Sequence, residues 1–70
     1  MEILFTHHAE SRLSKRRLLQ EEVIDAIHFP DKTLKKHGKY YYQKNLSRGI
    51  IEVVCEKTEK GLNVITLYWI

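Results

Sequence analysis

Three side chains near the N-terminus combine one titratable ring with two permanent positive charges. His8, Arg12 and Arg16 lie four residues apart, so on a helix each successive member turns by only about 40° and the three form one stripe. An imidazole exchanges protons near neutral pH, and two guanidinium groups can hold a phosphate between them. The stripe therefore indicates phosphoryl chemistry; the alternative is that both arginines pair with carboxylates inside the fold.

Positive charge is gathered in two stretches of the chain that contain no Asp or Glu. Residues 11–17 and 32–48 hold ten of the twelve Lys and Arg, whereas seven of the nine Asp and Glu lie in residues 20–31 and 52–59. Such segregation can build a basic face that attracts phosphates, although an ordinary solvated surface is the alternative. With a net charge of +3, the chain is expected to bind a polyanion, and RNA is the partner that we expect.

The second basic stretch also carries three consecutive tyrosines, residues 40–42, among Lys39, Lys44 and Arg48. Interleaved basic and aromatic side chains suit stacking on exposed bases, although packing inside the fold is the alternative for most of them. Cleavage of RNA requires a base for the 2′-hydroxyl, an acid for the departing oxygen and cations for the charge on the phosphoryl group. His, Tyr, Lys and Arg supply these groups here.

Other kinds of chemistry have no sequence support. The phosphate-binding, dinucleotide-binding, zinc-protease and serine-hydrolase motifs do not occur. Cys55 is the single cysteine, and Cys, His and carboxylates nowhere gather at metal-ligand spacing. No apolar run reaches the roughly 20 residues of a membrane span, and no signal peptide pattern is seen. We therefore expect a cytoplasmic protein without cofactor, metal or membrane contact.

The elements that must position these residues change type at Pro30. Apolar periodicity predicts a strand over 2–5, a helix over 7–16 capped by Thr6, and a helix that ends near residue 28. After Pro30, β-branched and aromatic residues predict strands over 39–46, 50–57 and 62–70 and a short fourth one over 33–36. The fold class is therefore α+β, with two N-terminal helices on one face of a three- or four-stranded antiparallel sheet.

This arrangement leaves the second face of the sheet open. Strict alternation along the last strand places Val64, Thr66 and Tyr68 on one side, opposite Ile65 and Leu67. The first set is the more polar, so we expect it on the open face. The chain is too short for a second domain, so residues 1–70 are expected to form a single domain.

Several motifs resemble a family of small prokaryotic proteins that is catalogued as a domain of unknown function. The matching segments are Phe5-Thr6-His7-His8-Ala9 with Arg12 and Arg16, then Pro30-Asp31, and finally Val64-Ile65-Thr66-Leu67-Tyr68. That family is similar to the RelE, ParE and BrnT toxins of toxin–antitoxin systems. The resemblance implies a RelE-like fold, of the barnase, EndoU, colicin and RelE type.

The resemblance also implies a function: a toxin that binds RNA on the open sheet face and cleaves it without a metal, as an endoribonuclease of the mRNA interferase type. Its implied catalytic residues are His8, Arg12, Arg16 and Tyr68. The residues expected to bind RNA are Arg17, Lys39, Tyr41, Lys44 and Arg48, which lie in the two basic stretches, and Thr66, which belongs to the matching motifs.

Three alternatives remain open beside this hypothesis. The chain could be a nucleic-acid-binding module without catalysis, a protein that receives an acidic antitoxin on its basic surface, or a ParE-like poison of gyrase. A homodimer is also expected to be feasible, because Tyr68, Trp69 and Ile70 end an apolar strand. The chain departs from the family pattern at Arg17 and Leu19, where Gly and Ser or Thr are common, and this departure removes the usual N-cap of the second helix.

Overall fold

The computed structural model describes residues 1–70 as two helices and five strands. Their order along the chain is β1 (Glu2–Phe5), α1 (His7–Arg16), α2 (Gln20–His28), β2 (Lys32–Lys36), β3 (Lys39–Leu46), β4 (Gly49–Lys57) and β5 (Gly61–Trp69). The bounds agree with the helices and strands predicted from periodicity to within two residues, and the short segment before Gly38 is a strand.

The sheet corrects the expected architecture, because it is mixed and has five strands. Its spatial order is β1-β5-β4-β3-β2, with β1 parallel to β5 and every other pair antiparallel. The expected fold class, a RelE-like arrangement of two N-terminal helices on a three- or four-stranded antiparallel sheet, is therefore wrong for this chain. The strand predicted over residues 2–5 is present and precedes the helices, but its parallel pairing with β5 was not predicted. A four-residue apolar segment does not reveal its distant partner, since its pairing with residues 61–64 depends on the path of the whole chain.

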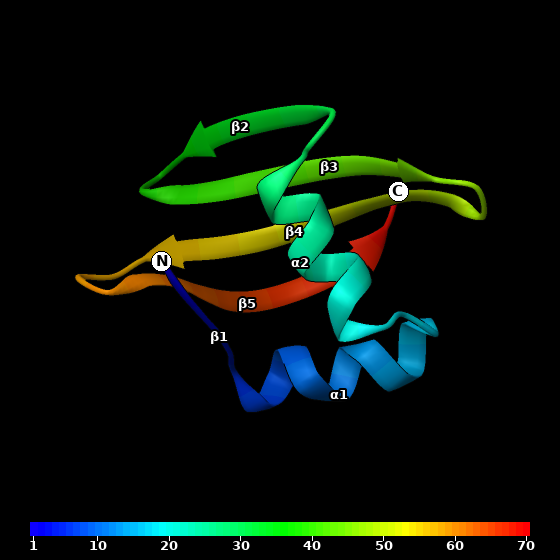
Figure 1. The fold of residues 1–70 in the computed structure, drawn as a ribbon, viewed down its shortest axis with the longest axis horizontal. Coiled ribbons are helices and arrows are strands. Elements are labelled where there is room, and N and C mark those ends of the chain that lie inside the picture. Colours follow the sequence, from blue (N-terminus) through cyan, green and yellow to red (C-terminus); the bar gives the residue numbers. More distant parts are fainter.

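The two helices take different places relative to the sheet (Figure 1). Helix α2 lies across one face, in front of β3 and β4, whereas α1 lies along the outer edge of β5. The backbone N–H of Thr6 donates to Val64 O at 3.1 Å, and the indole N–H of Trp69 donates to Arg16 O at 2.9 Å. Because these contacts lie at opposite ends of α1, the helix runs alongside β5 in the same direction and covers the edge that β1 leaves free.

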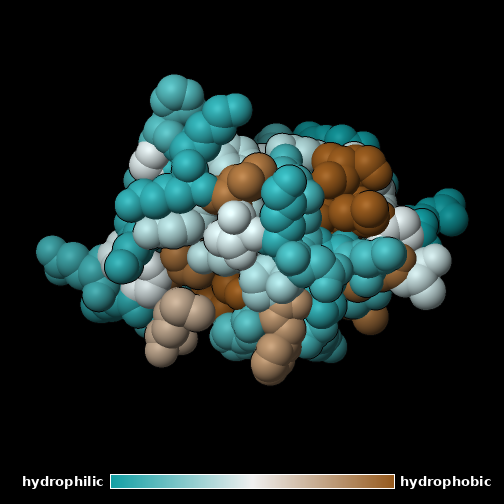
Figure 2. All heavy atoms as spheres, turned by 90° about the horizontal axis from the view of Figure 1, so that it is seen from above, coloured by the Kyte–Doolittle hydropathy of each residue, from teal (hydrophilic) through white to brown (hydrophobic).

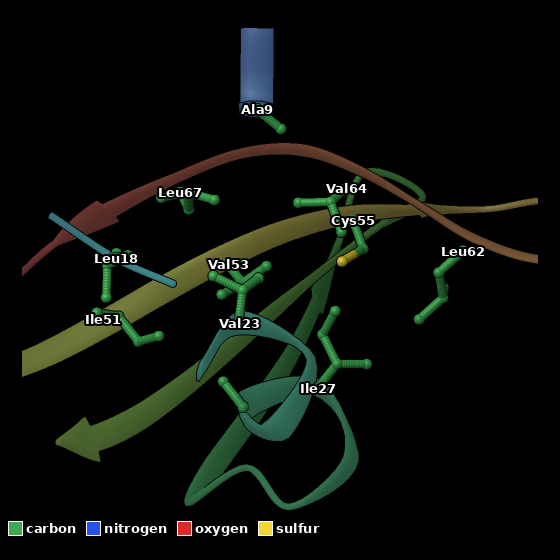
Figure 3. Close-up of a cluster of buried hydrophobic side chains, with 11 residues drawn as sticks. Ala9, Leu18, Val23, Ile27, Ile51, Val53, Cys55, Leu62, Val64 and Leu67 are labelled. Atoms are coloured by element: carbon green, nitrogen blue, oxygen red, sulfur yellow. The ribbon is translucent and has the colours of Figure 1, made fainter. Parts of the chain in front are cut away.

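The core lies between α2, the start of α1 and the inner face of β4 and β5. Figure 3 shows Val23 and Ile27 of α2 facing Val53 and Cys55 of β4, with Ala9 of α1 beyond β5. Burial raises the pKa of the Cys55 thiol to about 12, so this side chain packs as a small apolar group. The buried cluster also contains Leu18, Ala26, Ile51, Leu62, Val64 and Leu67.

A β-bulge at Ile65 breaks the alternation of β5. Cys55 pairs with Val64, but the preceding residue Val54 pairs with Thr66, so Ile65 is an extra residue. Val64 and Leu67 therefore both point into the core, while Thr66 keeps to the open face. The prediction that Val64 shares a face with Thr66 and Tyr68 is wrong for this reason, whereas Thr66 and Tyr68 do share the open face.

The connection between the helices contains Arg17 and Leu19, the two positions at which the chain departs from the expected motif. Arg17 ends α1 in the left-handed region, at φ 55° and ψ 48°, a position that glycine adopts without strain. Leu19 begins α2 without a side-chain cap, but the Glu22 carboxylate accepts a hydrogen bond from the Leu19 N–H at 3.0 Å. Half of a capping box therefore replaces the missing N-cap.

Strand β2 forms the other edge of the sheet and is exposed along its whole length. Seen from this edge, hydrophilic side chains cover much of the surface, with hydrophobic atoms between them (Figure 2). Three lysines, Lys32, Lys35 and Lys36, line the edge beside Leu34. Charged edge strands of this kind resist pairing with other chains. Neither helix is long and apolar enough to cross a membrane.

Candidate functional site

The face of the sheet opposite α2 carries polar and ionisable side chains at its centre. Cross-strand pairing brings Gln43 of β3, Glu52 of β4 and Tyr68 of β5 into one row, since each is the register partner of the next. The neighbouring row contains Tyr41, Val54 and Thr66. Directly paired residues on one face lie within side-chain contact, so these strands build one surface, which we call the open-face site.

Glu52 is the hub of the open-face site. Its carboxylate accepts a hydrogen bond from Gln43 Nε2 at 2.8 Å and a second, short one from the Tyr68 hydroxyl. The hydrogen bond to Glu52 raises the pKa of Tyr68 to about 12, and burial of the phenol is the second cause. The phenol therefore stays protonated at neutral pH and acts as a donor. A carboxylate has about four lone-pair positions, so Glu52 retains capacity to accept a further proton donor.

Sequence reasoning missed Glu52, which it counted only among the acids outside the basic stretches. The available signal was its place as the single charged residue within the apolar run Ile50-Ile51-Glu52-Val53-Val54. A charge at the centre of a strand that is otherwise apolar costs free energy unless it is hydrogen-bonded. Such a residue merits attention as a functional candidate.

His8 reaches the open-face site from the first turn of α1. Its Nε2 lies 3.1 Å from Thr66 Oγ1. The start of the helix is fixed at this point because Thr6 Oγ1 accepts the Ala9 N–H and donates to Ile65 O, each at 3.1 Å. The N-cap therefore holds α1 on the bulge of β5, and the bulge turns Thr66 toward His8.

Arg12 lies one turn beyond His8 on the same side of α1. Its side chain is half-buried, and its Nε is shielded from solvent without a hydrogen-bond partner in the chain. The ion pairs of the protein are His7–Glu10, Lys44–Asp25 and Arg48–Glu22. The alternative that Arg12 and Arg16 pair with carboxylates is therefore not seen. Arg16, a further turn along, is exposed.

Two of the expected RNA-binding residues instead tie α2 to the sheet. Lys44 Nζ donates to Phe29 O at 2.7 Å and lies 3.7 Å from the Asp25 carboxylate. Arg48 Nη2 donates to Glu22 at 3.0 Å and to Arg17 O at 3.2 Å, and its guanidinium lies 5.6 Å from the centre of the Trp69 ring. These contacts lie on the helix side, away from the open-face site.

The Arg48 contact also affects the acid that it meets. The pKa of Glu22 is lowered, first by the hydrogen bond from the Leu19 N–H and then by Arg48. Arg17 adopts its left-handed conformation beside this group, with its carbonyl engaged by Arg48. The structure thus gives Arg17, Arg48 and Lys44 roles in joining helices and strands.

The remaining expected residues divide between the two faces of the sheet. Tyr41 and Lys39 have open-face positions on β3, where Lys39 pairs with Glu56. Tyr40 and Tyr42 point to the helix side and pack against the core. Of the expected site residues, His8, Thr66, Tyr68 and Tyr41 therefore belong to one surface. Arg12 lies one helical turn from His8, and Lys39 lies toward the end of that surface.

The observations that favoured a dimer have another explanation within the chain. Tyr68 is bonded to Glu52, and Trp69 packs against the core and donates to Arg16 O. Only Ile70 of the three terminal residues is an exposed large hydrophobic side chain.

The fold and the open-face site together define a small protein with a five-stranded mixed sheet, one face of which is covered by a helix while the other carries ionisable groups. The chain belongs to the family described as a domain of unknown function (DUF4258), which matches residues 5–69. The matched range includes every residue of the open-face site. No curated protein and no solved structure matches the chain.

Proposed function

We propose that the open-face site binds single-stranded RNA and cleaves it by metal-independent transesterification. Glu52 accepts the proton of the 2′-hydroxyl, and the 2′-oxygen attacks the adjacent phosphorus. The bond from phosphorus to the 5′-oxygen breaks, and the His8 imidazolium gives that oxygen its proton. The products are a 2′,3′-cyclic phosphate and a 5′-hydroxyl, so atoms and charges balance without a co-reactant.

The observation that carries this proposal is that two neighbouring open-face residues of β5 contact the proposed acid on α1 and the proposed base on β4. Thr66 contacts His8, and Tyr68 contacts Glu52. Residues two apart on a strand are separated by about 6.7 Å. A phosphate on this face would therefore have a carboxylate at one side and an imidazole at the other, as general acid–base catalysis requires.

Arg12 supplies the positive charge that the reaction needs. A phosphodiester gains negative charge as the 2′-oxygen attacks, and pre-positioned donors at this point lower the barrier. The Nε of Arg12 is shielded and unpartnered, so a phosphate oxygen would satisfy a donor that the fold leaves free. Arg16 extends the positive charge along α1.

Tyr68 acts as a positioning residue for Glu52 in this scheme. Its hydroxyl remains protonated because its pKa is raised to about 12, and it therefore fixes one carboxylate oxygen while the other accepts from Gln43. A carboxylate with restricted rotation presents its free lone pairs in one direction.

A toxin role would follow from RNA cleavage in the cytoplasm, and it is supported only by the motif resemblance. An acidic antitoxin would be the expected partner in that case. The non-catalytic RNA-binding module is the second candidate, and the lysines at positions 32, 35, 36 and 39, none of which forms an ion pair with a carboxylate, favour polyanion binding in either case.

The test is incubation of the purified protein with single-stranded RNA, with and without EDTA. We expect cyclic-phosphate products in both conditions, and their loss in Glu52→Gln and in the His8→Ala, Arg12→Ala double variant. Circular dichroism of each variant must match the wild type. Cleavage that requires a metal, or full activity in either variant, would contradict the proposal. Salt-dependent binding without any products would favour the non-catalytic module.

A further inference from the structure

A shallow hollow lies on the open face beside Glu52, between β2 and β3. It has a volume of about 160 Å³ and is lined by Leu34, Lys36, Tyr41 and Glu52. Leu34 and Tyr41 are register partners across the two strands, so one apolar and one aromatic side chain stand next to each other. The hollow therefore shares the carboxylate of the proposed reaction but adds a surface that the reaction itself does not use.

Tyr41 is the tyrosine of the triplet whose ring has no aromatic or cationic partner. On the opposite face, the rings of Tyr40 and Tyr42 stack with centres 6.1 Å apart and planes 13° from parallel. Lys35 Nζ lies 5.6 Å from the centre of the Tyr40 ring. The helix-side tyrosines are therefore engaged with each other, whereas Tyr41 lines an open hollow.

The size of the hollow limits what it can hold. Pockets for drug-sized ligands have volumes of roughly 300–1,000 Å³, so a volume of about 160 Å³ fits a single ring system. Stacking of a base on an aromatic side chain contributes about 1–3 kcal/mol. We infer that this hollow is a nucleobase subsite, with Tyr41 as the stacking surface. The inference rests on the proposed function, since it assigns the hollow to the same RNA strand.

Lys36 gives the subsite a preference among bases. An ammonium group only donates hydrogen bonds, and Lys36 is exposed and forms no ion pair. Uracil and guanine present a carbonyl oxygen where cytosine and adenine present an amino group. Lys36 therefore favours keto bases, uracil and guanine, because an amino group facing its ammonium would leave two donors opposed.

The direct test measures binding of 2′-fluoro oligouridine and oligocytidine, which lack the 2′-hydroxyl and cannot be cleaved. We expect the wild type to bind oligouridine roughly 3- to 10-fold more tightly, as one hydrogen bond predicts. Lys36→Met should bring the two affinities together. Tyr41→Leu should weaken binding of both by about 5- to 100-fold. Lys32→Met is the matched control, because Lys32 lies on the same face of β2 but outside the hollow.

Equal affinities of the wild type for the two oligomers, or a preference that survives in Lys36→Met, would overturn the subsite. The proposed function is tested separately with ordinary RNA. His8→Ala, which removes the proposed acid and lies outside the hollow, should lose cleavage but keep the preference for 2′-fluoro oligouridine. If His8→Ala still cleaves RNA, the proposed mechanism fails, while the subsite is decided by the two affinities alone.

Discussion

Glu52 on β4 and Tyr68 on β5 are register partners on the open face, and the Tyr68 hydroxyl donates a hydrogen bond to the Glu52 carboxylate. This contact joins the one acid at the centre of the sheet to the strand that also holds His8 through Thr66. Because this hydrogen bond raises the pKa of Tyr68, a change in that pKa reports whether the Glu52 carboxylate is present. The arrangement leads to predictions that separate chemistry from stability.

Removal of the Glu52 charge should lower both the rate of RNA cleavage and the pKa of Tyr68. In Glu52→Gln the pKa of Tyr68 should fall from about 12 toward its ordinary value of 10.0, because the carboxylate that favours the protonated phenol is gone. Ultraviolet titration of tyrosinate measures this change. RNA cleavage should fall by about 10²- to 10⁴-fold, the usual contribution of a general base. Glu56→Gln, on the same face of β4 but outside the network, should alter neither.

The stability of the protein should depend on Tyr68 in alkaline solution. Since the pKa of Tyr68 is raised to about 12 in the folded state, its contribution is fully present below pH 10 and is lost as the pH rises from 10 to 12. The difference in unfolding free energy between the wild type and Tyr68→Phe should shrink across this window. Urea denaturation at several pH values measures it, and a constant difference would contradict the bond between Tyr68 and Glu52.

The two arginines Arg12 and Arg48 should behave in opposite ways. Arg12→Gln should weaken RNA binding and reduce the dependence of log affinity on log salt by about one, with little loss of stability. Arg48→Gln removes the exposed ion pair with Glu22 and should cost about 0–1 kcal/mol of unfolding free energy. Cleavage should be retained in Arg48→Gln. The reverse pattern would mean that RNA lies on the helix side.

Arg17→Gly should stabilise the protein. The left-handed conformation at φ 55° costs a non-glycine residue roughly 1–2 kcal/mol, and the greater flexibility of unfolded glycine offsets part of the gain. We expect an increase of roughly 0.5–1 kcal/mol in unfolding free energy. Lys15→Gly, inside the last turn of α1, should instead destabilise by about 0.5–1 kcal/mol. A loss of stability in Arg17→Gly would show that this conformation is not adopted.

Gly61→Ala should displace β1 from the sheet. A Cβ at residue 61 would lie 2.0 Å from the backbone oxygen of Glu2, so the parallel pairing of these two residues has no room for it. Hydrogen exchange should rise in residues 2–5 and the melting temperature should fall, while β3 and β4 stay protected. Unchanged protection in β1 would contradict the mixed sheet.

Local patterns were enough to predict most elements but not their neighbours. The bounds of residues 7–16 and 39–46 follow from periodicity and β-propensity, which depend on nearby residues. The strand that pairs with residues 2–5 cannot be predicted from nearby residues, because β1 pairs with a strand at the far end of the chain. Alternation along β5 failed at Ile65, since a bulge is defined by the facing strand as much as by its own sequence.

The site was predictable to the extent that it lies on one helix. The spacing of His8 and Arg12 predicts their common face of the helix. The structure adds that His8 contacts Thr66 and that the Arg12 Nε has no partner. Lys44 and Arg48 could not be assigned, because their carboxylate partners lie on α2 and a charge run does not reveal its partners. Glu52 was not predicted as a site residue, because the side chains expected to contact RNA are basic or aromatic rather than acidic.

The extra residue at Ile65 lets β5 present Val64 and Thr66, which are two residues apart, to opposite faces of the sheet. Deletion of Ile65 would leave an unbroken two-residue repeat in which Val64 and Leu67 still face the core and Thr66 and Tyr68 still face the open side. The deletion would instead remove the backbone oxygen that accepts the Thr6 hydroxyl, and with it one anchor of the helix that carries His8. A relative that lacks this residue would therefore keep every face of β5 and yet hold His8 less firmly, so gaps at this position carry as much information as substitutions.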